Sequence, residues 1–237
     1  MISNNSLRNS VSHIFAGVLL DFDGTIIDST EAIVENWRRV AKELNIDYQE
    51  IVSTSHGRRS IDVLRELDPS KANWDYVTAM ESRIPYLTET SAVEIPGARK
   101  LLESLDRSRV PYAIVTSGSR ALLDGWLRIL HLPQPKEVIV AEDVAVGKPD
   151  PEGYRKAREK ICYGNKTMGD ILVIEDAPAG VKAGKDAGCK VLGVATTHAV
   201  KQLKDAGADW VVENCQHVQV IDDGGEGHFC FNFYPTL

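Results

Sequence analysis

Strands that alternate with helices over the second half of the chain limit its fold more than any other feature of the sequence. Four short apolar runs between residues 112 and 205 are each followed by a helix-forming segment. This alternation is typical of a parallel sheet with helices on both faces. The predicted strands are 112–116, 138–141, 171–175 and 191–195, and the predicted helices are 120–130, 152–160, 179–187 and 199–205.

An earlier apolar run, residues 18–20, predicts the first strand of this sheet and leads directly into Asp21-Phe22-Asp23-Gly24. Side chains alternate between the two faces of a strand, so Asp21 and Asp23 should point the same way while Phe22 points into the core. Gly24 allows the chain to turn sharply out of the sheet. Taken alone, Asp-x-Asp-Gly also suits a calcium loop or an ordinary strand exit.

Residues 30 to about 93 show helical periodicity without a convincing strand. A helix capped by Ser29 or Thr30 is expected to run to Leu44, followed by helices at about 59–67 and 73–87. We therefore predict a helical insertion in an α/β core, with the insertion at residues 30–94 and the core at residues 1–29 and 95–237.

The end of the chain predicts a β-hairpin at about 217–234, with strands at 218–221 and 228–233 around a glycine-rich turn. Phe229, Phe231 and Phe233 alternate, which gives the hairpin one aromatic face. We expect this face to pack on the core; a dimer contact is the alternative.

The composition of the chain argues against several classes of function. The net charge is −7 and there is no basic run, which argues against a nucleic-acid surface. Four widely spaced cysteines give little support to a zinc site or a disulfide framework, and they favour a reducing, cytoplasmic location. No apolar stretch is long enough to span a bilayer, and residues 1–12 are expected to be a frayed leader, with a weak transit peptide as the alternative. We expect a monomer or a weak dimer.

Functional groups gather at the carboxyl ends of the strands in a parallel sheet. Carboxylates that converge there would repel one another unless they are neutralised, and Mg²⁺ with oxygen ligands is the simplest solution. A phosphate would then fit between the metal, a lysine and hydrogen-bond donors. Each residue taken alone could instead have a structural role. A hydroxyl residue could cap a helix, the lysine could be solvated, and the acids could favour the start of a helix. The groups at the predicted strand ends are Asp21, Asp23, Thr116, Ser117, Gly118, Lys148, Glu175 and Asp176.

The sequence also resembles a known family. Asp-Phe-Asp-Gly-Thr, Thr-Ser-Gly, Gly-Lys-Pro-Asp-Pro and Glu-Asp-Ala-Pro-Ala-Gly, in this order, are similar to the four motifs of the haloacid dehalogenase-like hydrolases. Further segments, including Ser-His-Gly-Arg-Arg and Gly-Lys-Pro-Asp-Pro-Glu-Gly-Tyr, resemble the fungal glycerol-phosphate and 2-deoxyglucose-6-phosphate phosphatases. The resemblance implies a doubly wound, Rossmann-like core in which the helical insertion is the cap domain.

The resemblance implies that Asp21 is the nucleophile, which forms an aspartyl-phosphate, and that Asp23 is the general acid and base. It implies that Mg²⁺ is held by Asp21, Asp176 and the main-chain carbonyl of Asp23, with Glu175 close by or bound through water. Asp150-Pro151 is interpreted only as a helix start.

Phosphate binding is assigned to Lys148, to the hydroxyl of Ser117 or Thr116, and to the Gly118 amide. The sequence leaves open which of the two hydroxyls holds the phosphate. In the cap, His56 and Arg59 are expected to contact the substrate, and Arg58 is given the weaker role.

These assignments predict a Mg²⁺-dependent phosphatase that acts on a small polyol or sugar phosphate, such as glycerol phosphate or 2-deoxyglucose 6-phosphate. The alternatives are a phosphomutase and a catalytically silent binding protein. Mutases with a similar core carry a cap histidine where this chain has Ile33, which counts against that activity. A dehalogenase is disfavoured because that branch lacks the second aspartate, which is present here as Asp23.

Overall fold

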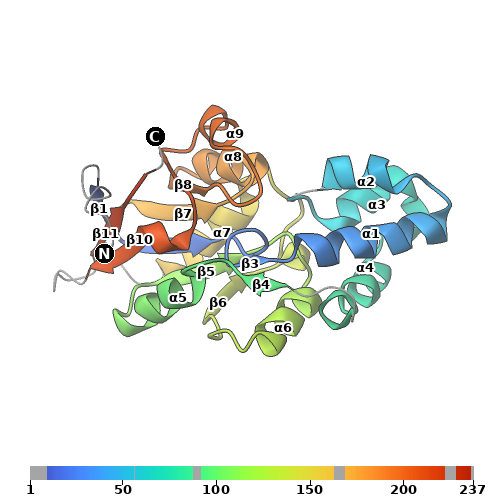
Figure 1. Ribbon diagram of the computed structural model, residues 1–237, viewed down its shortest axis with the longest axis horizontal. Coiled ribbons are helices and arrows are strands. Elements are labelled where there is room, and N and C mark those ends of the chain that lie inside the picture. Colours follow the sequence, from blue (N-terminus) through green and yellow to red (C-terminus); the bar gives the residue numbers. More distant parts are fainter. Residues whose placement is uncertain (1–9, 56, 88–91, 163–168, 222–227, 236–237) are drawn as a thin grey trace, which may run out of the picture.

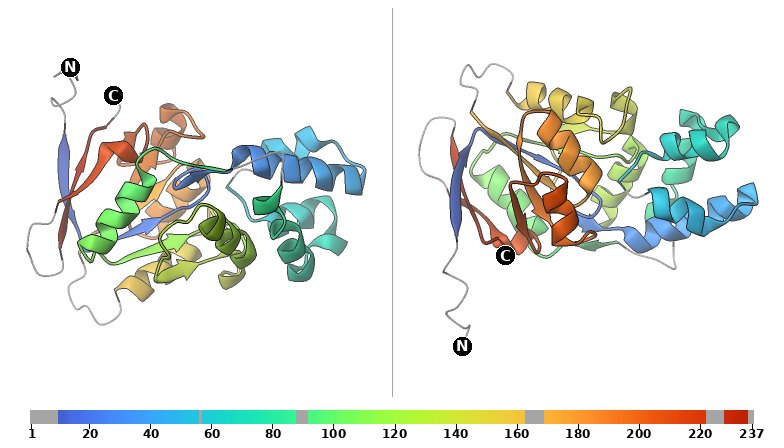
Figure 2. Two further views of the ribbon diagram at one scale, coloured as in Figure 1. Left: turned by 60° about the horizontal axis from the view of Figure 1, so that its bottom comes forward. Right: turned by 90° about the horizontal axis from the view of Figure 1, so that it is seen from above.

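The computed structural model describes residues 10–55, 57–87, 92–162, 169–221 and 228–235. An α/β core occupies the middle of the molecule (Figure 1). A helical cap lies at one end of the long axis, and a small antiparallel sheet lies at the other end (Figure 2).

Six parallel strands form the central sheet of the core, in the order β6-β5-β2-β7-β8-β9. The predicted parallel α/β core is therefore confirmed. β9 is a strand that the sequence did not indicate. The strands are β2 (Gly17–Leu20), β5 (Tyr112–Val115), β6 (Glu137–Ile139), β7 (Ile171–Glu175), β8 (Lys190–Val194) and β9 (Trp210–Val212).

Helices cover both faces of this sheet and bury two separate apolar layers. Val18 and Leu20 belong to the layer that includes Trp126, whereas Leu19 belongs to the layer that includes Tyr154. This alternation follows from the period of two in a strand. The first layer contains α5 (Ala98–Arg107) and α6 (Arg120–Ile129); the second contains α7 (Glu152–Ile161), α8 (Pro178–Asp186) and α9 (Val200–Asp205).

In its described residues the cap consists of four α-helices with an apolar centre of their own. The helix predicted at 73–87 is divided into α4 and a 3₁₀ turn, Ile84–Tyr86, because a proline ring at position 85 disfavours a continuous helix. The second helix was not predicted, since its hydroxyl-bearing and β-branched residues are weak helix formers. The helices are α1 (Thr30–Leu44), α2 (Tyr48–Ser55), α3 (Ser60–Leu67) and α4 (Trp74–Glu81), and a 3₁₀ turn, Pro69–Lys71, follows α3.

The two connections between core and cap run side by side. β3 (Ile27–Asp28) pairs with β4 (Val93–Glu94) in an antiparallel ribbon. The predicted insertion, residues 30–94, thus begins and ends beside this ribbon. The exact bounds of the two domains stay a prediction.

The small sheet has the order β1-β11-β10, and β11 is its central strand. The predicted C-terminal hairpin is confirmed by β10 (Val218–Ile221) and β11 (Phe229–Phe233). β1 (Val11–Phe15) was not predicted: residues 11 and 12, assigned to a frayed leader, belong to a strand, while residues 1–9 lie outside the described part.

The aromatic face of the hairpin packs on the core, as expected. Phe231 and Phe233 are fully buried and contact Phe15, with ring centroids 5.7 and 6.2 Å away. Trp210 closes this cluster from β9, 5.3 Å from the ring of Phe233. Phe229 is half-buried.

All four cysteines are free, in agreement with the prediction that they form no disulfide framework. Within the described ranges, every helix is too short or too polar to cross a bilayer.

Candidate active site

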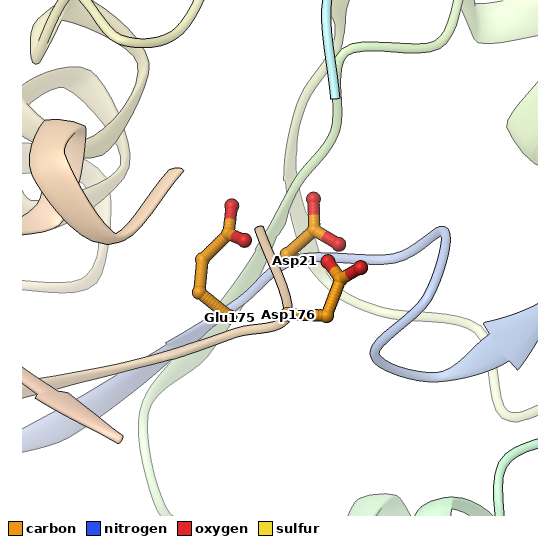
Figure 3. Close-up of side chains that lie close together, drawn as sticks. All are labelled: Asp21, Glu175 and Asp176. Atoms are coloured by element: carbon orange, nitrogen blue, oxygen red, sulfur yellow. The ribbon is translucent and has the colours of Figure 1, made fainter. Parts of the chain in front are cut away.

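The strand ends of the core meet under the cap and line one cavity. Asp21 and Asp23 follow β2, the segment 116–118 follows β5, Lys148 precedes α7, and the pair 175–176 ends β7. The sequence thus placed these groups together correctly. The carboxylates of Asp21, Glu175 and Asp176 lie close together at this end of the sheet (Figure 3).

Lys148 is the cation at the centre of this cavity. Its ammonium group donates to Asp21 Oδ1 at 2.6 Å, to Glu175 Oε1 at 2.7 Å and to the carbonyl of Val115 at 3.0 Å. Burial alone would lower the pKa of Lys148, but the charges of Asp21 and Glu175 outweigh it and raise that pKa above its ordinary value. Lys148 therefore stays charged.

Asp21 is buried and only partly paired. Desolvation raises its pKa to about 7, since burial and the charge of Glu175 together outweigh the attraction of Lys148. Among the described residues its Oδ2 atom has no hydrogen-bond partner. A buried acceptor without a partner is costly, so this atom marks the place where a ligand is expected.

Asp23 is held by hydroxyl groups. Ser29 Oγ donates to its Oδ1 at 2.6 Å, and Thr116 Oγ1 lies 3.4 Å from its Oδ2. Desolvation raises the pKa of Asp23, against the opposing effect of these hydrogen bonds. Ser29 was predicted as a helix cap; it precedes α1, but its hydroxyl serves Asp23, and Asp28 accepts from the Thr30 amide instead.

The two candidate hydroxyls after β5 have different surroundings. Thr116 Oγ1 faces Asp23 and accepts from the Gly118 amide at 2.9 Å. Ser117 Oγ donates to the carbonyl of Gly57 in the cap, also at 2.9 Å. Both residues line the cavity, so the choice between them stays open.

Glu175 accepts three hydrogen bonds from the described residues. Besides Lys148, the hydroxyl of Tyr154 donates to its Oε1 at 2.9 Å, and the Ala177 amide donates to its Oε2 at 3.0 Å. A Cβ at Gly180 would lie 1.6 Å from Oε1, so the position requires glycine. These contacts fix the carboxylate against the lysine.

Asp176 lies beside the first strand end. Thr197 donates its hydroxyl proton to Asp176 Oδ2. Burial raises the pKa of Asp176 well above its ordinary value, and the charges of Asp21 and Glu175 add to this effect. A Cβ at Gly24, where φ is +92°, would collide with the same carboxylate.

The carboxylates suit a divalent cation. One oxygen from each of Asp21, Glu175 and Asp176 lies within 4.8 Å of the others. Lys148 pairs with Asp21 and Glu175, while the carboxyl groups of Asp23 and Asp176 line the same cavity without an ion pair to it among the described contacts. Hard cations bind such oxygen sets, and the unpartnered Asp21 Oδ2 offers a ligand atom.

The cap residues differ from the expectation. His56 lies outside the described residues. Arg59 is buried and does not line the cavity; its guanidinium contacts main-chain carbonyls of a core loop. Arg58, which was given the weaker role, does line the cavity and pairs with Glu66. Sequence adjacency could not show which of the two arginines points inward.

Several residues of the site were not assigned a role from the sequence. Tyr154 lies in one of the motifs quoted above, but its hydroxyl was assigned no role. Asn36 and Glu81 line the cavity from the cap, although neither carries a motif. Their polar character at buried positions is the one signal that could have singled them out, and it needs the fold to be visible.

Comparisons with known proteins agree with this geometry. A family model described as haloacid dehalogenase-like hydrolase matches residues 18–194. Glycerol-1-phosphate phosphohydrolase 2 of Saccharomyces cerevisiae is 39% identical over 85% of this chain and 83% of its own length. 2-Deoxyglucose-6-phosphate phosphatase 1 of the same yeast is 37% identical over 88% and 92%, respectively.

A solved hydrolase from Pseudomonas syringae matches the fold with a TM-score of 0.70 and 25% identity, covering 84% of this chain and 94% of that one. The resemblance seen in the motifs is therefore confirmed by similarity over most of the chain, and the chain belongs to the haloacid dehalogenase-like hydrolase family.

Proposed function

We propose that this protein is a Mg²⁺-dependent phosphatase that hydrolyses a small polyol or sugar phosphate through an aspartyl-phosphate. The observation that carries the proposal is the surplus of buried carboxylates around Lys148, with Asp21 Oδ2 unpartnered. The names of the relatives, which act on glycerol 1-phosphate and 2-deoxyglucose 6-phosphate, support the substrate class.

Asp21 is the nucleophile. Lys148 holds Oδ1, which fixes the carboxylate while Oδ2 remains available. Attack on phosphorus forms the bond from an Asp21 oxygen to phosphorus and breaks the bond from phosphorus to the substrate oxygen. Mg²⁺ bound by Asp21, Asp176 and the Asp23 carbonyl would neutralise the charge between an anionic nucleophile and an anionic phosphoryl group. Glu175 is committed to other partners, which supports a metal contact through water.

Asp23 is the general acid and base. Its raised pKa favours a protonated fraction that can protonate the leaving alkoxide. The resulting carboxylate can then take a proton from the water that attacks the phosphoryl-aspartate. Ser29 donates to Asp23 Oδ1 and so keeps the side chain oriented through both steps.

Lys148, the Gly118 amide and the hydroxyl of Thr116 or Ser117 bind the phosphoryl oxygens. These groups are held by hydrogen bonds to the core and the cap before the substrate arrives, so they can stabilise the charge of the transferring group with little reorganisation.

The cap half of the cavity suits a small hydroxylated substrate. Asn36, Arg58 and Glu81 provide polar groups, whereas Ile33 and Trp37 provide apolar contacts. Ile33 cannot carry a proton between substrate and leaving group, which supports a phosphatase over a phosphomutase. We propose that residues 30–94 act as a cap domain that excludes water during transfer.

The test is phosphate release from a panel of glycerol phosphate, 2-deoxyglucose 6-phosphate, other hexose phosphates and mannitol 1-phosphate, with Mg²⁺ and with chelator. We expect turnover of at least one member, lost on chelation. Turnover that survives chelation would contradict the proposal. We also propose a cytoplasmic location, which the four free cysteines support.

A further inference from the structure

Arg59 joins the cap to a core loop through three of its five N–H donors. Nη1 donates to the carbonyls of Ala141 and Val144, at 3.2 and 2.7 Å, and Nη2 donates to that of Ala145 at 3.0 Å. The remaining two N–H groups bind Asp62 in a bidentate pair at 2.7 and 3.0 Å. A guanidinium has five donors, so the side chain is saturated and has none left for a substrate.

The loop that accepts these bonds leads directly to Lys148. The loop is held from the core side by its amides, since the Ala145 and Val146 amides donate to Glu152 at 2.9 and 3.1 Å. Arg59 holds the opposite, carbonyl side. The path of the chain into Lys148 is thus fixed jointly by the core and the cap.

Gly147 makes room for this contact. A Cβ at residue 147 would lie 2.7 Å from Arg59 Nε and 2.9 Å from its Cγ. The glycine before the active-site lysine therefore lets the arginine side chain pass against the loop. The position of the Arg59 side chain and the path of the loop into Lys148 therefore both depend on the absence of a side chain at residue 147.

The residues before Arg59 contact the site itself. The Gly57 carbonyl accepts from Ser117 Oγ, and Arg58 lines the cavity. Three consecutive cap residues thus contact the cavity and both core loops that carry the proposed phosphate-binding groups.

We infer that Arg59 is a positioning residue that couples docking of the cap to placement of Lys148 on the phosphoryl group. The effect on turnover rests on the proposed function; the docking itself does not. When the cap is seated, the carbonyls of residues 141–145 are fixed and Lys148 is held between Asp21 and Glu175. When Arg59 leaves the loop, the lysine loses one side of its support.

A double-mutant cycle tests the coupling with the best substrate of the panel. We expect Arg59→Ala to lower kcat by about 10- to 100-fold, since a displacement of about 1 Å in a catalytic group has effects of this size. In a Lys148→Ala background the same change should lower kcat less than about threefold, because the residue through which it acts is gone. An equal factor in both backgrounds, or a change in KM alone, overturns the inference.

Arg65→Ala is the matched control. Arg65 binds the same carboxylate, Asp62, at 2.7 Å from the same helix, but it is exposed and makes no described bond to the core. We expect turnover to stay within about twofold of wild type. Arg59→Lys keeps the charge but loses the planar set of guanidinium donors, so it should also lower kcat. This variant replaces Arg59→Ala in the test if the alanine variant folds poorly.

Hydrogen exchange tests docking without substrate. In Arg59→Ala the amides of Ala145 and Val146 should exchange faster than in wild type and in Arg65→Ala. Unchanged exchange overturns the inference. If wild type hydrolyses no phosphomonoester, the proposed function fails while this measurement still decides whether Arg59 fixes the loop.

Discussion

Two groups of charged side chains contact the core around the Lys148 loop, and they differ in how completely their charges and hydrogen bonds are satisfied. The active-site cluster, made of Asp21, Asp23, Lys148, Glu175 and Asp176, has four carboxyl groups and one cation. The docking cluster, Arg59 with Asp62, is an ion pair in which every N–H of the arginine has an acceptor, and Arg65 also binds Asp62.

The difference separates a site from a structural contact. Unbalanced buried charge is unfavourable unless a ligand completes it, which points to a cation and a phosphate in the active-site cluster. A saturated ion pair needs nothing more, so the docking cluster serves to hold two parts of the protein together. Burial of an arginine next to an active site is therefore no sign that it binds substrate.

Asp21→Asn should have the largest effect, a loss of kcat of about 10³-fold or more, because the nucleophile is removed. The variant should fold with a Tm at or above that of metal-free wild type, since one of the crowded buried carboxylates becomes neutral. Steady-state rates and thermal unfolding measure both. Asp186→Asn, at an exposed pair with Lys182, is the control and should change neither.

Lys148→Ala should lower kcat by about 10²- to 10³-fold, because a fixed charge on the phosphoryl group is lost. Breaking a buried pair also leaves unpaired carboxylates, so unfolding free energy in chelator should fall by about 3–5 kcal/mol. Denaturant unfolding measures this change in unfolding free energy. Lys182→Ala, which breaks an exposed pair, should cost less than about 1 kcal/mol; equal losses in the two variants would contradict the contrast drawn between buried and exposed pairs.

Thr116→Val and Ser117→Ala decide between the two hydroxyls. The variant that removes the phosphate donor should lower kcat/KM by about 10²-fold, as loss of one donor does in comparable sites. The other should lower it by less than about tenfold. Kinetics on one substrate with saturating Mg²⁺ makes the comparison, and two equally mild losses would argue against a hydroxyl donor from this loop.

Mg²⁺ should stabilise the wild-type protein by about 2.7 kcal/mol at a concentration of 100 Kd, because only the folded state gathers the carboxylates. Asp176→Asn should remove most of this gain, and Arg59→Ala should keep it, since the docking cluster holds no metal. Thermal unfolding with and without the ion gives the shift. An equal loss in both variants would show that the two clusters are not separate.

Glu81→Gln should have the smallest effect on stability, seen as a pH dependence. Glu81 accepts from the Ser119 amide at 2.7 Å and from Ser60 Oγ at 2.5 Å between cap and core, and burial raises its pKa above the usual 4.5. Because the pKa of Glu81 is higher in the folded state than in the unfolded state, protonation of Glu81 favours the folded state. This contribution to stability is fully present below pH 4.5 and is lost as pH rises through the raised pKa. The Tm of the variant relative to wild type should therefore increase with pH, and a constant difference would contradict the assignment.

The positions of residues that follow a local pattern were predicted well, whereas their roles stay a prediction. Asp21, Lys148 and Asp176 each follow an apolar strand or a recognisable motif, and a parallel sheet brings strand ends together whatever the loops do. Five of the six core strands and the C-terminal hairpin were predicted for the same reason, since periodicity and turn residues are local signals, whereas β9 was missed.

Features that depend on distant partners were missed. β1 pairs with β11 across more than 200 residues, as in the Ser12–Asn232 hydrogen bond, and its short pattern carries no hint of that partner. Arg59 follows Arg58 directly, so only the packed cap shows which side chain enters the cavity and which reaches the core loop.

The central claim is that the unbalanced carboxylate cluster receives a phosphoryl group on Asp21. Acid quenching during turnover with Mg²⁺, followed by borohydride reduction and mass spectrometry of the peptides, tests it directly, because borohydride converts an aspartyl-phosphate to homoserine. We predict homoserine at position 21, dependent on both substrate and Mg²⁺. Turnover with modification at Asp23, or at neither aspartate, would contradict the account.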